Sequence, residues 1–286
     1  MEQNLPTDED INLYEKMGWH ITNMIIEPDL IEKAVIGARE FYVGNIDTPL
    51  PKSFGIANDL HDEALAIRNN EFVSLQKKAL KDIAFHPVVV ETAARLSRSK
   101  NIRLFADSLI SKLPQKENSA GIIGWHTDKA YWPTCTSDDM LTAWIPLQDV
   151  TFDMGPLLLI NESHTWKEEA WLKKFYSFNK QDLSELEKNL KENFPDYTEQ
   201  TITIKKGQVS FHNCNVVHCS RPNLSSVNRM ALAVHFQDER NRYRKAFKDN
   251  GDLIEIGYDK ICRKDENGHP DYNDPYFFPV VYPLNN

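Results

Sequence analysis

The feature that most constrains this fold is a change of pattern at Ile102. From there to Asp238 the chain runs in short apolar segments, each bounded by Gly, Pro, Asn or Asp. Segments of this length and composition are typical of β-strands separated by turns. Several such strands in one stretch predict a barrel or a two-sheet jelly roll. The segments cover residues 102–114, 141–151, 155–163, 201–213, 215–223 and 228–238.

The first hundred residues have a helical pattern instead. Residues 5–19 carry capping residues, apolar positions at helical spacing and a glycine stop, and residues 27–44 repeat that logic. Residues 72–97 predict two more helices, divided at Pro87 because the residue before a proline disfavours the helical conformation. The charged stretch 166–194 predicts a helical insertion with a solvated face.

Together the two patterns predict an α+β protein. Its core would be a double-stranded β-helix (a jelly roll of the cupin-like kind), with the N-terminal helices packed on one sheet and a helical insertion. A length of 286 residues suits one elaborate domain. We therefore expect a single domain over residues 1–286, mainly helical over 1–100, with the jelly-roll core over 101–240 and a C-terminal extension over 241–286.

Charge and hydropathy exclude several classes of partner. The chain has 33 Lys and Arg against 42 Asp and Glu, a net charge of −9, so its field repels nucleic-acid backbones and anionic lipids. Its acidic start lacks the regions of a signal peptide, and no apolar run approaches the length that spans a membrane. We expect a cytoplasmic protein with a small-molecule substrate, no nucleic-acid partner and no membrane partner. The sequence makes no prediction of its oligomeric state.

Cysteine usage points to reduced thiols. The four cysteines form no CxxC pair, so neither a zinc knuckle nor a thioredoxin-type motif is indicated. Cys219 adjoins His218, but neighbours on a strand face opposite ways and would not form a catalytic dyad.

The most specific chemical signal is the sequence GIIGWHTDKAYW at 121–132. If this segment is a strand, His126 and Asp128 project to the same face and converge on one metal ion. His218, on a later short strand, is the candidate third ligand, and His212 competes with it because it lies on the same β run. Two imidazoles and one carboxylate form the facial triad of non-haem iron(II) oxygenases, which leaves positions open for a bidentate co-substrate and dioxygen.

Arg229 favours His218 as the third ligand. It follows His218 by eleven residues and shares a predicted strand face with Ala231, Ala233 and His235. Small alanines beside an inward-facing arginine leave a cavity that contains one guanidinium group, which is suited to bidentate hydrogen bonding with a carboxylate. The alternative is a structural arginine paired with an acidic neighbour.

On these residues the sequence resembles the phytanoyl-CoA dioxygenase family of iron(II)- and 2-oxoglutarate-dependent oxygenases. The resemblance covers most of residues 7–238 and is carried by the HxD motif, the block TAWIPLQDVTFDMGPLLLINESH, and a histidine and an arginine eleven residues apart. It implies that the cofactors are Fe(II), 2-oxoglutarate and dioxygen. The implied iron ligands and catalytic residues are His126, Asp128 and His218.

The resemblance also implies a co-substrate site. Arg229 would hold the distal carboxylate of 2-oxoglutarate, and Ser220, Trp144 and Ser108 would line the site. Core packing for Trp144 and a turn role for Ser220 are equal alternatives.

The implied activity is oxidation, by default hydroxylation, of a C–H bond in a small metabolite or natural-product intermediate. Desaturation, cyclisation or demethylation would use the same centre. Asp128 disfavours halogenation, because related halogenases carry Gly or Ala at this position. A non-catalytic cupin-like binding protein and a zinc hydrolase are the alternatives from other classes, and neither accounts for Arg229 beside the triad. Candidate substrate-pocket residues, each of which could equally be barrel packing, are Trp125, Tyr131, Trp132 and His212.

Overall fold

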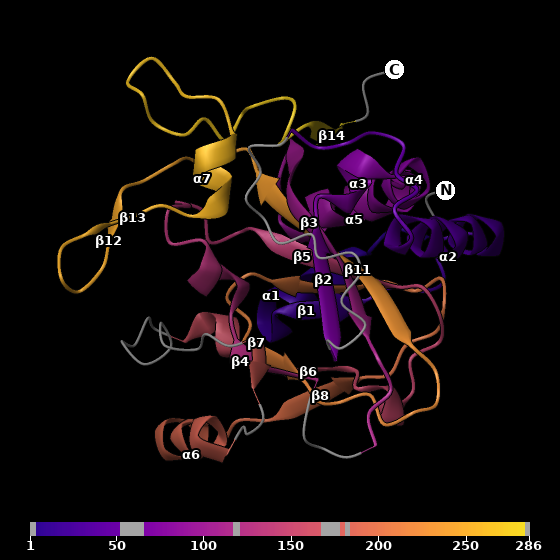
Figure 1. Ribbon diagram of the computed structural model, residues 1–286. Coiled ribbons are helices and arrows are strands. Elements are labelled where there is room, and N and C mark those ends of the chain that lie inside the picture. Colours follow the sequence, from indigo (N-terminus) through magenta and orange to yellow (C-terminus); the bar gives the residue numbers. More distant parts are fainter. Residues whose placement is uncertain (1–3, 52–65, 117–120, 167–177, 181–183, 284–286) are drawn as a thin grey trace.

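The core consists of two antiparallel β-sheets (Figure 1). The computed structural model describes residues 4–51, 66–116, 121–166, 178–180 and 184–283. The larger sheet has the strand order β1-β9-β5-β11-β3-β14, and β2 also pairs with β3. Its strands are β1 (Trp19–Ile21), β2 (Ile67–Glu71), β3 (Ile102–Lys112), β5 (Leu141–Pro146), β9 (Ser210–Asn213), β11 (Arg229–Asp238) and β14 (Val280–Tyr282).

The smaller sheet has the order β7-β4-β10-β6-β8. Apolar side chains of the two sheets meet in one buried cluster, which includes Trp144 and Ala231 of the larger sheet and Leu159 and Ile202 of the smaller. This two-sheet arrangement confirms the predicted jelly-roll core. The strands of the smaller sheet are β4 (Ile122–His126), β6 (Leu157–Ile160), β7 (Phe178–Lys180), β8 (Glu199–Ile202) and β10 (His218–Ser220).

Helices cover the outer face of the larger sheet, as predicted. Alternate residues of β11, among them Leu232, Val234 and Phe236, pack against helical residues such as Ile31 and Val89. Figure 1 shows α2 to α5 gathered on this side of the molecule. The helices are α1 (Asp8–Met17), α2 (Pro28–Tyr42), α3 (Val73–Gln76), α4 (Lys78–Ala84) and α5 (Pro87–Leu96).

Local sequence explains where α1 begins and ends. The Thr7 side chain accepts a hydrogen bond from the backbone N–H of Asp10, while the Asp10 carboxylate accepts from the backbone N–H of Thr7. Gly18 ends the helix with a φ of 84°, a left-handed conformation that glycine adopts without strain. Both signals are legible in the sequence.

Two predicted helical segments, 72–97 and 166–194, differ in detail from the structure. The first hundred residues also contribute β1 and β2, and the segment 72–97 holds three helices, α3 to α5, instead of two. Within the predicted helical insertion 166–194, α6 (Ser184–Asn193) is helical, but β7 pairs with β4. A strand forms there because β4 otherwise has an unpaired edge, whose backbone groups need partners. Residues 167–177 and 181–183 of that insertion lie outside the described part.

The C-terminal extension folds over one end of the larger sheet (Figure 1). It contains the hairpin of β12 (Ala246–Phe247) and β13 (Leu253–Ile254), followed by α7 (Gly257–Ile261). The ring of Tyr258 on α7 packs edge-on against Phe72 and Phe105. The extension therefore contributes to a second buried cluster, beside the mouth of the jelly roll.

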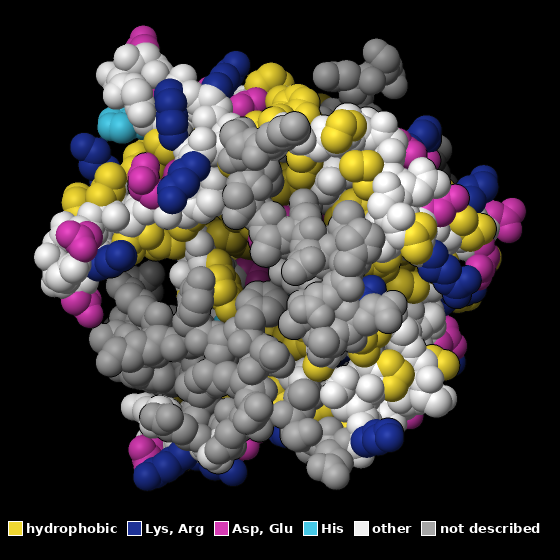
Figure 2. Space-filling view, in the orientation of Figure 1, with side chains coloured by type: hydrophobic (Ala, Val, Ile, Leu, Met, Phe, Trp, Pro, Cys, Tyr) yellow, Lys and Arg dark blue, Asp and Glu magenta, His cyan; other side chains and the backbone are white. Residues whose placement is uncertain are grey.

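The surface carries mixed charge on the face shown in Figure 2, where basic and acidic side chains are scattered around the rim. Among the described helices, none is both long and apolar enough to cross a lipid bilayer. All four cysteines are buried and free, in agreement with the expected reduced thiols.

Candidate active site

A cavity of about 140 Å³ lies between the two sheets. Residues of β3, β5, β10 and β11 supply half of its lining, and β2 and α7 contribute Asn69, Glu71 and Tyr258. The cavity contains all seven residues that the sequence predicts for iron and 2-oxoglutarate: Ser108, His126, Asp128, Trp144, His218, Ser220 and Arg229.

The three predicted iron ligands converge in this cavity. One ligand atom from each of His126, Asp128 and His218 lies within 4.8 Å of the others, and all three side chains are buried. His126 ends β4 and His218 begins β10, and these two residues are paired across the antiparallel ladder. Strand pairing therefore holds the two imidazoles side by side, with ring centroids 4.1 Å apart.

Backbone carbonyls set the tautomer of both imidazoles. His126 Nδ1 lies 2.7 Å from the carbonyl oxygen of Gly124, and His218 Nδ1 lies 2.9 Å from that of Val216. A carbonyl only accepts, so each Nδ1 must carry the proton and donate it. Each Nε2 then presents a lone pair to the centre, as a metal ligand requires. Burial lowers the pKa of both imidazoles, which keeps them neutral and free to bind a metal.

Asp128 reaches the centre in a different way from the one expected. The sequence predicts that His126 and Asp128 alternate along a strand, but β4 ends at His126 and Asp128 begins a 3₁₀ turn over Asp128–Tyr131. Thr127 caps this turn, and its side chain accepts from the backbone N–H of Ala130 at 3.2 Å. The threonine between the two ligands is thus a capping residue that turns the chain back toward the centre.

The two carboxylate oxygens of Asp128 have different surroundings. Oδ1 faces the Nε2 atoms of His126 and His218, at 3.9 and 3.7 Å. Oδ2 accepts hydrogen bonds from the Thr142 hydroxyl and from His212 Nε2, the latter at 3.2 Å. This arrangement leaves Oδ1 as the single oxygen available to a metal.

A short relay supports that orientation of Asp128. The Thr142 hydroxyl donates its proton to Asp128, so His235 Nδ1, 2.7 Å from the same hydroxyl, must be the donor to Thr142. Burial alone would raise the pKa of Asp128, but the hydrogen bond from His212 and the electrostatic interaction with His218 hold it well below its usual range. Asp128 is therefore an anion. His212, the competitor for the third ligand position, contacts this carboxylate and stands outside the triad.

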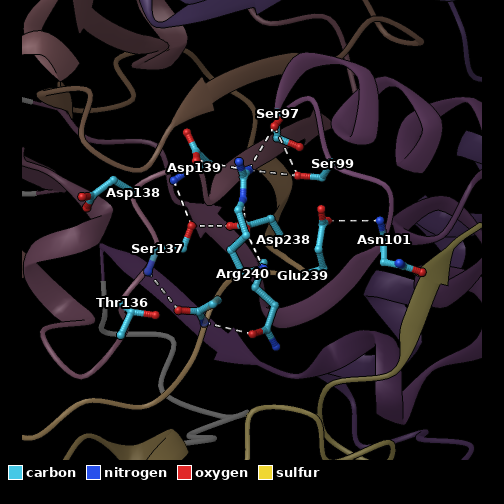
Figure 3. Close-up of polar contacts among 12 residues, drawn as sticks. Ser97, Ser99, Asn101, Thr136, Ser137, Asp138, Asp139, Asp238, Glu239 and Arg240 are labelled. Carbon is cyan, nitrogen blue, oxygen red and sulfur yellow. Dashed lines mark hydrogen bonds and ion pairs between the residues drawn. The ribbon is translucent and has the colours of Figure 1, made fainter.

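The turn that carries Asp128 is anchored to the end of β11. The buried Lys129 donates to the Ser137 carbonyl and pairs with Asp138 Oδ1 at 3.2 Å. Figure 3 shows how this loop is held: the Ser137 hydroxyl donates to Asp238, and Arg240 binds Asp238 Oδ1 at 2.9 Å. The Arg240 guanidinium also contacts Asp139 Oδ2 at 3.1 Å, as well as Ser97 and Ser99 after α5.

Arg229 supplies positive charge at the other end of the cavity. It is 1% exposed, and its Nη2 donates to the Gly155 carbonyl at 3.1 Å. Its Nε and Nη1 are buried and have no hydrogen-bond partner among the described residues. Desolvation lowers the pKa of Arg229 to about 10, which leaves it charged at neutral pH. The guanidinium is therefore a buried cation with two unused donors.

Gly155 lets the chain pass close to Arg229. It has a φ of 63°, and a Cβ there would lie 2.3 Å from the carbonyl oxygen of Arg221. Only glycine avoids that contact, and its own carbonyl is the one that orients Arg229.

The remaining predicted co-substrate residues surround Arg229. The Trp144 ring lies 5.3 Å from the guanidinium carbon, within the range of cation–π attraction. Ser220 Oγ is buried without a partner among the described residues. Ser108 pairs with Ala233 in the β3–β11 ladder and lines the same cavity. Lys112 Nζ donates to the Ser220 carbonyl at 3.1 Å, and burial together with the neighbouring Arg229 lowers the pKa of this amine well below its ordinary value.

Predicted and observed cavity residues differ in part. Tyr131, Trp132 and His212 line the cavity, whereas Trp125 packs in the core beneath the smaller sheet because it faces away from its neighbour His126. Sequence reasoning also missed further lining residues. The polar ones among them are Asn69, Glu71, Thr142 and Tyr258. His235 was placed on the inward face of β11, but nothing in the sequence ties the others to this site.

Comparison with known proteins places the chain in a family. The family model for phytanoyl-CoA dioxygenase (PhyH) matches residues 54–231. The chain belongs to the phytanoyl-CoA dioxygenase family. It is therefore a non-haem iron oxygenase that depends on 2-oxoglutarate. No curated protein matches the chain.

Solved structures agree with this fold. The non-heme alpha ketoglutarate dependent epimerase SnoN from nogalamycin biosynthesis aligns with a TM-score of 0.66 and 17% identity, over 96% of this chain and 98% of that one. The carbocyclase SnoK from the same biosynthesis aligns at 0.65 and 19%, over 87% and 94%. EctD from S. alaskensis with 2-oxoglutarate and 5-hydroxyectoine aligns at 0.64 and 17%, over 86% and 80%.

The residues of the cavity fit the cofactors that the family implies. Two neutral imidazoles and one carboxylate oxygen on one side are the donor set of a facial triad, which suits Fe(II). The two unused N–H groups of Arg229 suit a carboxylate, and the buried Ser220 hydroxyl offers one more hydrogen bond.

Proposed function

We propose that this oxygenase hydroxylates a C–H bond of a small metabolite or natural-product intermediate. His126, Asp128 and His218 hold Fe(II), and Arg229 binds the distal carboxylate of 2-oxoglutarate. Ser220, Trp144 and Ser108 line the co-substrate site. The catalytic domain is the whole chain, residues 1–286.

One observation carries this proposal. A buried guanidinium with two unused donors shares a single cavity with a convergent His-Asp-His cluster. A structural arginine would have its donors paired within the protein, since leaving buried donors unpaired is costly. A bound dicarboxylate satisfies both features at once, with one end at the metal and the other at Arg229.

The chain's own residues position and protect the reaction. Iron and 2-oxoglutarate, when bound, supply the activation of dioxygen and the oxidation of the substrate, with release of succinate and carbon dioxide. The Gly124 and Val216 carbonyls keep the protons of His126 and His218 on Nδ1. Thr142 and His212 hold Asp128 Oδ2, so that Oδ1 alone faces the metal site. Apolar walls around Trp144 and Leu157 exclude water from the co-substrate.

The names of the similar structures support a small-molecule substrate, but they include several different outcomes of oxidation. They include an epimerase, a carbocyclase and a protein bound to a hydroxylated small molecule. Hydroxylation is the proposed outcome, and desaturation, cyclisation or demethylation would need only a different fate for the substrate after C–H cleavage.

An anaerobic titration tests the proposal. Metal-free protein receives Fe(II) and then 2-oxoglutarate, while the visible metal-to-ligand charge-transfer band is recorded. We expect the band in wild type, no band in Asp128→Ala, and a band that needs far more 2-oxoglutarate in Arg229→Gln.

Arg221→Gln is the matched control. Arg221 precedes Arg229 by eight residues and is exposed, with its guanidinium paired to Glu187 at 3.1 Å. This variant should titrate like wild type. Absence of the band in folded, iron-loaded wild type would overturn the co-substrate assignment, and equal behaviour of the two arginine variants would overturn the role of Arg229.

A further inference from the structure

Strand β2 brings an acidic residue to the side of the cavity that lies beyond β3 from Arg229. Residues of β2 alternate, so Asn69 and Glu71 face the cavity while Arg68 and Asn70 face away from it. In the β2–β3 ladder, Asn69 pairs with Ile110 and Glu71 pairs with Ser108, the two residues through which β3 lines the same cavity. The edge of the larger sheet thus adds a polar wall outside the predicted iron and 2-oxoglutarate sites.

This wall presents acceptors that the protein does not fully satisfy. Glu71 Oε1 accepts one hydrogen bond, from the Tyr258 hydroxyl at 3.2 Å. No Lys or Arg among the described residues forms an ion pair with Glu71. Asn69 Oδ1 is buried and has no partner within the described part of the chain. Two such acceptors on one wall of a cavity are suited to a ligand that donates several hydrogen bonds.

Aromatic side chains flank the same acceptors. Tyr258 and Trp132 both line the cavity. Phe105 holds both rings in place, with edge-on contacts at centroid distances of 5.1 Å to Tyr258 and 5.2 Å to Trp132. The negative face of an aromatic ring and the charge of a carboxylate both attract a cation, so the two attractions add.

We propose that Glu71, Asn69 and Tyr258 form the recognition site for a protonated amine on the primary substrate. This inference rests on the proposed function, because it assigns the space beside the metal site to the substrate. An ammonium group carries three donors and one positive charge. It would donate to Glu71 and Asn69 and lie against the aromatic rings.

The charge distribution around the cavity supports this assignment. Burial raises the pKa of Glu71 to about 7, an effect that the nearby Asp107 carboxylate increases and the Tyr258 hydrogen bond opposes. A bound ammonium would relieve that penalty by favouring the ionised carboxylate.

Binding of three matched probes tests the substrate class. Phenethylamine, 2-phenylethanol and phenylacetate share one skeleton and differ in the charge of the end group. Each is titrated by calorimetry into protein loaded with Ni(II), a redox-inert substitute for iron, and 2-oxoglutarate. We expect phenethylamine to bind at least about tenfold more tightly than the other two at pH 8. Glu71→Gln should reduce this preference to less than about threefold, and Glu266→Gln, at an exposed position of the C-terminal extension, should leave it unchanged.

The outcomes separate this inference from the proposed function. If 2-oxoglutarate binds but phenylacetate or phenylethanol binds as well as the amine, the amine site is wrong and the oxygenase assignment stands. A preference for the amine that survives in Glu71→Gln would also overturn the site. If 2-oxoglutarate itself does not bind, the proposed function fails. The three probes are then compared on metal-free protein. A preference for the amine that depends on Glu71 still supports the amine site in that case. The comparison within wild type needs no variant, so it holds even if Glu71→Gln folds poorly.

Discussion

Two sides of the cavity are built in different ways. The Arg229 side is made by strands of the jelly-roll core, with Arg229 on β11, Ser220 on β10 and Trp144 on β5. The Glu71 side lies beyond β3, and its hydrogen bond joins residues 187 positions apart on β2 and α7. One side carries a buried guanidinium, and the other carries a carboxyl group whose pKa is raised to about 7. Core strands thus supply the proposed co-substrate site, while an edge strand and the C-terminal extension supply the proposed site for the substrate amine.

Removal of the metal centre should abolish turnover and give the largest effect. Asp128→Ala removes the only anionic ligand and should lower succinate formation by at least about 1000-fold, which corresponds to more than about 4 kcal/mol of lost stabilisation. Metal content after gel filtration checks the cause. The control is Asp249→Ala, in the exposed β12–β13 turn. A variant that retained iron and turnover would remove Asp128 from the triad.

Loss of Arg229 should weaken the binding of 2-oxoglutarate and leave the binding of the amine probe nearly unchanged. Arg229→Gln should raise the KM for 2-oxoglutarate by about 100-fold, because the buried partner of a carboxylate is removed, with a much smaller change in kcat. Affinity for phenethylamine should stay within about threefold of wild type. Steady-state assays with varied 2-oxoglutarate and probe calorimetry provide both values. Equal losses of affinity for 2-oxoglutarate and for phenethylamine would show that Arg229 and Glu71 do not belong to separate binding sites.

Thr142 should affect the metal centre. Thr142→Val removes the hydroxyl that links His235 to Asp128 Oδ2 and should weaken metal binding by about 10- to 100-fold, as is usual when a partner of a metal ligand is lost. Co(II) titration of the metal-free protein measures this. Thr201→Val on β8, in the other sheet, is the control. An unchanged Co(II) affinity would mean that His212 alone orients the carboxylate.

Glu71 should give a smaller, pH-dependent effect on stability. Its folded pKa of about 7 exceeds the ordinary value of 4.5, so wild type binds this proton more tightly when folded. That contribution to stability is complete below about pH 4.5 and is lost as the pH rises through about 7. Relative to wild type, Glu71→Gln should therefore gain on the order of 2 kcal/mol between pH 5.5 and 8.5. Urea unfolding at both pH values measures the difference, and a constant difference would contradict the burial of this carboxylate.

Sequence patterns predicted the core of the site because its residues fall in regular strands. Alternation on β11 placed Arg229, Ala233 and His235 on one face and Leu232 and Phe236 on the other, and the structure has them so. The same reasoning was wrong about the backbone conformation at Asp128. Strand alternation would bring this carboxylate to the side of His126, but in the structure a 3₁₀ turn does so. The assigned roles of these residues stay predictions until metal and 2-oxoglutarate binding are measured.

The Glu71 side of the cavity could not be predicted from the sequence. Glu71 ends the polar segment IRNNE, which shows no apolar alternation and forms a strand by pairing with β3. Tyr258 belongs to a helix of five residues in the C-terminal extension. Their meeting is a product of tertiary packing around Phe72 and Phe105, and such long-range contacts leave no local signal.

The clamp between Ser137 and the end of β11 has a consequence for the order of events during synthesis. All three candidate ligands and Arg229 have been translated once residue 229 is added. The loop that steadies Asp128 still lacks its partners, because Ser137 binds Asp238 and Asn241, which are 101 and 104 positions further along the chain. A nascent chain that stops just after Arg229 would possess every candidate metal-binding group and yet lack the two contacts that fix Ser137. The clamp on the Asp128 loop is therefore complete only when the chain has been made through Asn241.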